Sequence, residues 1–137
     1  MPMIVTQNGD VQLLQNGVES AFTNVGLYQN PLVPTPTTIL SEIESADFNG
    51  YDGQHDITWM PAFINALGKG QKLAPSTQWT STAPLLNPNM IYGAFYLDSS
   101  ADLSAIFSFD APINVNAAAM AVFFQPSLTC VTEPPSP

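Results

Sequence analysis

The residues best suited to acid–base or metal chemistry lie within ten positions of one another near the middle of the chain. They are Asp47, Asp52, His55 and Asp56. A carboxylate beside an imidazole can act as a general acid–base pair or contribute to a metal site. His55 is the only histidine, so one chain cannot build a His-based metal cage. The same residues also fit a polar loop before a strand, and we favour that interpretation.

Residues 47–58 partly match a calcium-binding loop. Tyr51 stands at the third ligand position, Asp52 replaces the required glycine, and Thr58 stands where a bidentate Glu belongs. Weak calcium binding is therefore only a minor alternative to a loop without metal.

Other catalytic signatures are absent from the sequence. Cys130 is the only cysteine, so there is no intrachain disulfide and no cysteine pair for zinc. The nucleophile elbow, the phosphate-binding loop and the dinucleotide fingerprint are also missing. We therefore expect no catalytic residues, no cofactor and no bound metal, and no enzymatic activity.

The charge composition excludes several kinds of partner. Lys69 and Lys72 are the only basic residues apart from His55, against eleven acidic ones, which gives a net charge of −9. Binding to nucleic acid or to an anionic membrane needs several clustered cations. We expect neither partner. The N-terminus lacks a signal-peptide pattern, so we expect a soluble, non-secreted protein.

Thirteen prolines and eight glycines divide the chain into short segments, which favours strands over long helices. The pattern predicts a mainly β fold: an antiparallel β-sandwich, jelly-roll-like, with one or two short helices. The expected organisation is an N-terminal arm and short helix (1–20), one β-sandwich domain (21–130) and a flexible Pro-rich tail (131–137). The expected strands cover 21–29, 56–60, 77–82, 90–97, 103–109 and 120–126.

Three segments leave details open. Residues 8–17 fit either two Asn-Gly hairpin turns or a short helix that begins at Asn8 or Asp10 and ends at Gly17, which we favour slightly. Thr37 or Thr38 could begin a helical turn. Residues 60–67 could form a short helical insertion or a loop, ended by Gly68. The strand over 90–97 carries apolar residues on both faces and should be central.

Four aromatic residues could form a platform on which a sugar stacks: Tyr51, Trp59, Phe63 and Trp79. At strand spacing such residues belong more often to the core, and we favour that interpretation.

Several segments resemble a small family of tailed-bacteriophage virion structural proteins marked by an "EADF-x-GY" motif. The similar segments are Leu27–Asn30, the Pro/Thr-rich bridge to Thr37, Ala46–Tyr51, Ile91–Asp98, Phe107–Pro112 and the opening Met1–Val5 with Gly9–Leu14. The resemblance covers nearly the whole chain. It implies a structural component of the head or tail of a phage particle, without catalysis.

The charge then suggests a position in the particle. A protein of net charge −9 should avoid the DNA-filled interior. We therefore expect an outer-surface capsid decoration (cement) protein on the virion head, which binds the major capsid protein as a homo-oligomer, with a trimer as one option. Two terminal arms are candidates for that contact, with Met1, Pro2, Met3, Ile4 and Val5 in one and Val131, Pro134 and Pro135 in the other. The alternative is a receptor- or glycan-binding module of a tail or fibre.

Overall fold

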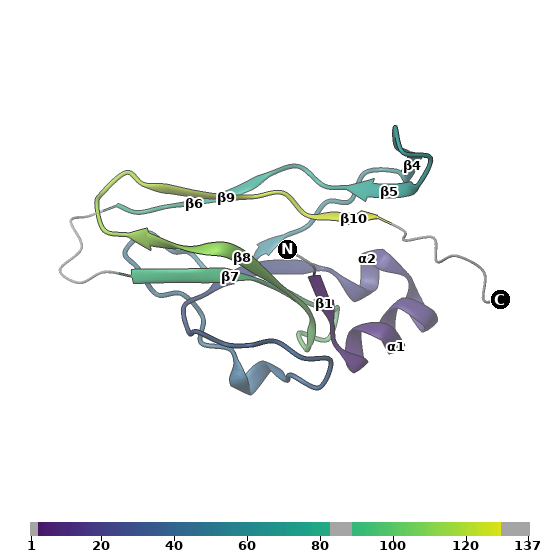
Figure 1. Cartoon of the computed structure of the whole chain (residues 1–137), viewed down its shortest axis with the longest axis horizontal. Coiled ribbons are helices and arrows are strands. Elements are labelled where there is room, and N and C mark those ends of the chain that lie inside the picture. Colours follow the sequence, from purple (N-terminus) through teal and green to yellow (C-terminus); the bar gives the residue numbers. More distant parts are fainter. Residues whose placement is uncertain (1–2, 83–88, 130–137) are drawn as a thin grey trace.

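The computed structural model describes residues 3–82 and 89–129, and its strands form two layers of antiparallel sheet (Figure 1). The mainly β class predicted from the sequence is confirmed. The expected short helices are present as α1 (Gln7–Asn16) and α2 (Val18–Ala21). The jelly-roll-like strand order stays a prediction.

The larger sheet has five strands in the order β1-β8-β7-β2-β3. They are β1 (Met3–Val5), β2 (Asn24–Tyr28), β3 (His55–Asp56), β7 (Asn89–Leu97) and β8 (Leu103–Val115). As predicted, β7 is central, and most of its side chains are buried. β8 is longer than the predicted strand, β3 is shorter, and β2 begins later because Ala21 ends α2.

The second layer consists of two small sheets that follow one another. One has the order β10-β5-β4, with β4 (Phe63–Ile64), β5 (Gly70–Leu73) and β10 (Ser127–Thr129). The other pairs β6 (Thr77–Thr80) with β9 (Ala121–Phe124). Pro75 and Pro126 lie between the two pairings, and a proline cannot donate to a strand ladder, which explains the interruption.

The main core fills the space between the layers. Strand β9 alternates between the two faces, so Val122 and Phe124 point inward while Phe123 is exposed. The ring of Phe124 meets Tyr96 of β7 and Phe107 of β8 edge-on, at centroid distances of 5.9 and 5.4 Å. These contacts across the layers hold the two sheets together.

A second, smaller core lies on the opposite face of the large sheet. Tyr28, Phe95 and Ile106 are buried there against Leu32 and Ile43 of the loop after β2. That loop contains the short 3-10 helix η1 (Leu40–Glu42), which begins later than the helical turn predicted at Thr37 or Thr38. The large sheet is therefore covered on both faces.

The N-terminal segment belongs to the sheet and is not a separate arm. Met3, Ile4 and Val5 pair with Phe107, Ile106 and Ala105 of β8, so the predicted boundary at residue 20 does not separate them from the β-domain. Helix α1 begins after Thr6 and not after Asn8 or Asp10, because the Thr6 hydroxyl accepts from Gly9 N at 3.0 Å. The predicted end at Gly17 is confirmed, with φ +83°.

Residues 60–68 form no helix, so the helical alternative is wrong; the loop alternative holds except at β4, which makes the segment part of a β-hairpin. β4 pairs with β5 around a turn in which the Asn65 carboxamide accepts from Leu67 N and Lys69 N. Gly68 has φ +75°, a conformation that glycine adopts at little cost. The side-chain bonds of Asn65 favour this turn over a helix. No helix in the described residues is long and apolar enough to cross a membrane.

Candidate functional site

The predicted titratable cluster forms a short chain of hydrogen bonds. His55 lies on β3, and its Nε2 is 2.6 Å from Asp52 Oδ1 in the preceding loop. Its Nδ1 bonds the hydroxyl of Thr77 on β6, in the other layer. The hydrogen bond from His55 holds the pKa of the Asp52 carboxyl below its usual value. The arrangement joins a carboxylate, an imidazole and a hydroxyl.

The surroundings of these hydrogen-bonded residues favour a structural role. The imidazole stacks on the buried Trp79 ring, with centroids 4.5 Å apart, and both of its nitrogens have protein partners. The Asp52 side chain is 71% exposed, so water competes for this ion pair. The structure does not bring the other two acids into the cluster: Asp56 accepts from Asn24, and Asp47 is exposed. In the described part of the chain, no three potential metal ligands come together.

The residues that partly match a calcium-binding loop do not form a cation site, because Tyr51 packs into the core. The Tyr51 hydroxyl is bonded to Leu27 N at 3.1 Å, and its ring packs against Phe48 and Trp79. Burial raises the pKa of this phenol. Because Asp52 bonds His55, it does not join Asp47 in a cation cage.

The sugar-stacking platform, considered as an alternative to a core role, does not form. Trp79 is 1% exposed, and its indole nitrogen donates to Gly53 O. Trp59 packs against the core and donates to Phe22 O. Of the four aromatic residues, only Phe63 is clearly exposed. Their role in the core, which the sequence favoured, is confirmed for Trp79.

A buried carboxylate escaped the sequence analysis. Asp98 is 1% exposed in the turn between β7 and β8. Its Oδ1 accepts from Ser100 N and Asp102 N at 2.8 and 3.0 Å, and its Oδ2 accepts from the Asn8 carboxamide of α1 at 2.8 Å. An aspartate directly after an apolar strand, followed by Ser-Ser, is a turn signal that could have identified it.

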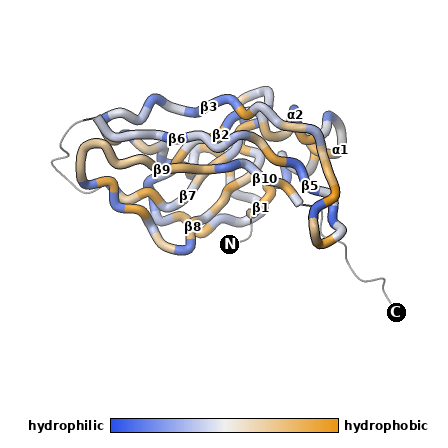
Figure 2. Tube along the Cα trace, turned by 90° about the horizontal axis from the view of Figure 1, so that it is seen from above, coloured by the Kyte–Doolittle hydropathy of each residue, from blue (hydrophilic) through white to orange (hydrophobic). Residues whose placement is uncertain are grey.

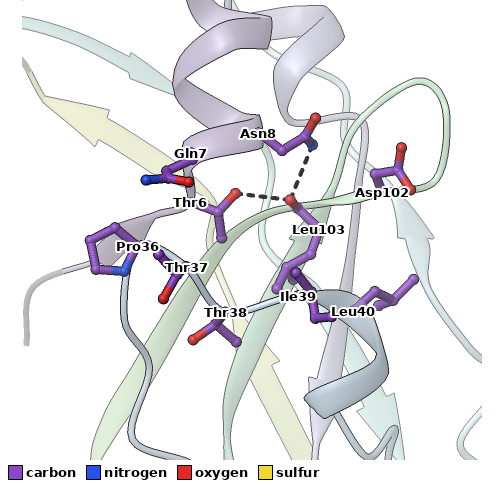
Figure 3. Close-up of a pocket in the computed structure, with 10 residues that line it drawn as sticks. All are labelled: Thr6, Gln7, Asn8, Pro36, Thr37, Thr38, Ile39, Leu40, Asp102 and Leu103. Carbon is purple, nitrogen blue, oxygen red and sulfur yellow. Dashed lines mark hydrogen bonds between the residues drawn. The ribbon is translucent and has the colours of Figure 1, made fainter.

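A pocket of about 280 Å³ lies where the loop after β2 meets the start of α1 (Figure 3). Asn8 and Thr6 both bond Leu103 O on one side, and Ile39 and Leu40 form the other side (Figure 3). Asp102 also lines it. The acidic Asp102 side chain of the β7–β8 turn makes this pocket unfavourable for an anion.

Most of the large apolar side chains that are exposed in the described residues fall into two segments of the chain. The first, which we call the loop patch, lies after β2; the second, the hairpin patch, lies on and beside β4. The loop patch comprises Val33, Ile39 and Leu40, and the hairpin patch comprises Met60, Phe63, Ile64 and Leu67. Exposed apolar side chains concentrated in one short segment favour a contact surface over a catalytic site.

An apolar groove of about 770 Å³ opens between the layers at the end of the molecule that carries the helices. Helices α1 and α2 with β1 and β8 form one side, and β5 and β10 form the other (Figure 1). We call it the interlayer groove. Its apolar lining comes from Met3, Val5, Leu13, Val18, Phe22 and Phe107 on the first side and Leu128 on the second.

The predicted binding arms are placed only in part. Met3, Ile4 and Val5 form β1, whose outer edge is the only part of that arm open to a further strand in the described structure. Met1, Pro2, Val131, Pro134 and Pro135 lie outside the described residues, as does Cys130.

Comparisons with family models, with curated proteins and with solved structures found no match for this chain.

Proposed function

We propose that the chain is a bacteriophage virion structural protein, an outer-surface decoration protein that binds the major capsid protein through the loop patch. The proposal assigns no catalytic step and no cofactor to the chain. It rests on the resemblance of the segments around Leu27–Asn30 and Ala46–Tyr51 to phage virion proteins and on the distribution of charge in the structure.

The charge distribution is the observation that carries the proposal. Lys69 and Lys72 lie within one hairpin, and no other lysine or arginine exists in the chain. Acidic side chains are exposed in segments spread along the chain, for example Glu19, Glu44, Asp52 and Asp110. Such a surface repels packaged DNA from nearly every direction. A place on the outside of a capsid is compatible with it.

The loop patch has the properties of a docking surface. Val33 is 82% and Ile39 60% exposed. Pro31, Pro34 and Pro36 restrict the backbone around them, so the loop loses little conformational entropy when it binds. The small pocket beside Ile39 and Leu40 could receive a side chain of the capsid protein.

Binding to capsids that lack this protein tests the proposal. The purified protein should co-sediment with such capsids and raise the temperature at which they break open, because binding stabilises the bound state by mass action. The double variant Val33→Ser/Ile39→Ser should bind at least about tenfold more weakly, since each exposed apolar contact contributes about 1 kcal/mol or more. Ile64→Ser/Leu67→Ser is a matched control with a similar loss of exposed apolar surface.

Salt provides a second measurement on the same complex. Apolar contacts are little affected by ionic strength, so binding in about 0.5 M salt should stay within about threefold of binding in about 0.1 M salt. Absence of co-sedimentation, a collapse of binding in salt, or an equal loss in both double variants would each refute the docking surface proposed here.

A further inference from the structure

The hairpin patch and the interlayer groove are complementary features of one chain. Ile64 is 72% and Leu67 80% exposed on the β4–β5 hairpin, where they form an apolar projection. The groove, about 770 Å³, is an apolar hollow wide enough for aliphatic side chains. The hairpin adjoins the groove of its own chain, because Ala62 and Gly70 belong to the lining, but its exposed tip points away from the layers (Figure 1).

Charge distinguishes the hairpin from the rest of the molecule. Both lysines of the chain, Lys69 and Lys72, lie on it, and no acidic residue occurs between Asp56 and Asp98. In Figure 2 the hairpin, near the right edge, combines strongly hydrophobic and hydrophilic stretches. At the groove, Glu19 is 71% exposed next to the lining residue Val18, and its Oε1 lies 3.3 Å from Lys72 Nζ of the same chain. That exposed pair is weak, so Glu19 can accept another cation.

From these observations we infer that a second copy of the chain occupies the groove. The apolar hairpin patch of one copy docks into the interlayer groove of the next, and Lys69 of the first copy pairs with Glu19 of the second. At physiological ionic strength the screening length is about 8 Å, so the opposite charges at the contact outweigh the distant like charges of the two molecules. The contact joins two different surfaces, so it forms a two-fold dimer where two copies exchange hairpins reciprocally, and a ring or an open chain where they do not.

This contact is separate from capsid docking, which uses the loop patch. It can exist in solution without a capsid. The two proposals can therefore fail independently.

Sedimentation or light scattering across the micromolar range tests the contact. The wild-type protein should self-associate, and Ile64→Ser/Leu67→Ser should weaken the association about hundredfold. Val33→Ser/Ile39→Ser removes equally exposed apolar groups elsewhere and should leave it unchanged. Leu128→Gln places a polar group in the groove and should also yield monomers, with circular dichroism confirming that it is folded.

Mixing the variants tests the head-to-tail geometry. The hairpin variant keeps an intact groove and the Leu128→Gln variant keeps an intact hairpin, so the mixture should form a one-to-one dimer that neither forms alone. A mixture that stays monomeric would refute docking of the hairpin into the groove and point to hairpin-to-hairpin pairing.

A charge exchange provides a test that leaves the core untouched. Lys69→Glu and Glu19→Lys should each weaken the association about threefold to tenfold, and the double exchange should restore it. Asp47→Lys makes the same charge change at an exposed acid away from the groove and should not weaken it. A monomeric wild type, or no recovery in the double exchange, would overturn the inference. Self-association only after removal of the residues beyond Thr129 would also overturn it, because the groove would then belong to the chain's own last residues.

Discussion

At the scale of single residues, buried or half-buried polar side chains connect elements that lie far apart in the sequence. Asp98 joins the β7–β8 turn to α1 through Asn8, which is 90 positions away in the chain. His55 likewise joins β3 to β6 through Thr77. A carboxylate and an imidazole are groups that catalytic sites commonly use. Here the hydrogen bonds of Asp98 fix α1 to the β7–β8 turn, and those of His55 connect the two layers.

Replacing Asp98 should expose its structural role. Asp98→Ala leaves the amides of Ser100 and Asp102 and the carboxamide of Asn8 without this acceptor. We expect a loss of about 2–4 kcal/mol in the free energy of unfolding, measured by urea denaturation. Asp98→Asn should cost less, because its carbonyl oxygen still serves the two backbone amides while its NH₂ faces that of Asn8.

The exposed Asp102 provides the control for this experiment. Asp102→Ala changes the same residue type in the same turn and should alter the stability by less than about 0.5 kcal/mol. Equal losses in the Asp98 and Asp102 variants would contradict the role given to the buried carboxylate.

At the scale of elements, the pairing of β7 with β8 organises the larger sheet. It runs from Asn89 opposite Val115 to Leu97 opposite Leu103, with irregular register between Ile91 and Gly93. The irregularity lies where Gly93 allows the two backbones and the Tyr28 ring to approach closely. A glycine at such a place in a central strand is explained by close approach and not by flexibility.

Gly93→Ala should therefore be strongly destabilising. A Cβ at this position would lie 2.1 Å from Phe107 O and 2.8 Å from the Tyr28 ring, so the strands would have to separate. We expect a loss of about 3 kcal/mol in the free energy of unfolding. The test is thermal or urea denaturation of the purified variant.

Gly53→Ala provides a comparison in which only backbone strain changes. Gly53 has φ +95° but no atom within 4 Å of an added Cβ. Gly53→Ala should lower the free energy of unfolding by about 1 kcal/mol. If Gly93→Ala were as mild as Gly53→Ala, the close packing of β7 against β8 would not hold.

At the scale of the whole molecule, net charge and sheet packing act in opposite directions. Buried contacts between the layers, such as Phe124 with Tyr96 and Phe107, stabilise the compact state. A net charge of −9 destabilises it through mutual repulsion. The Lys72–Glu19 ion pair opposes this repulsion locally.

Added salt should consequently raise the thermal stability. Raising the ionic strength from about 0.01 M to about 0.15 M shortens the screening length from about 30 Å to about 8 Å and weakens the repulsion between acidic groups. We expect a melting temperature higher by a few degrees, measured by calorimetry at pH 7 in dilute solution. An uncharged osmolyte at equal osmolality separates screening from general solvent effects, and a melting temperature that falls with salt would show that ion pairs dominate.

Local patterns were sufficient to predict much of this protein. The frequent prolines and glycines predicted short strands and the antiparallel β class, and two apolar faces predicted the central position of β7. The absence of arginine and the shortage of lysine and histidine are likewise properties of the composition, and the expectation of no nucleic-acid or membrane partner rests on them. These properties depend on residue type and on short-range spacing, which are visible in one dimension.

Tertiary structure alone decided the rest, because those features depend on contacts between distant segments. β1 and β10 are three residues long, too short for a periodic signal, and each exists because a longer neighbour, β8 or β5, supplies its hydrogen bonds. The hairpin at 60–68 likewise depends on its pairing with β5 and on the turn at Asn65. The burial of Trp79 and Asp98, the separation of Asp52 from Asp56, and the groove between the layers follow from how the two layers and the helices pack.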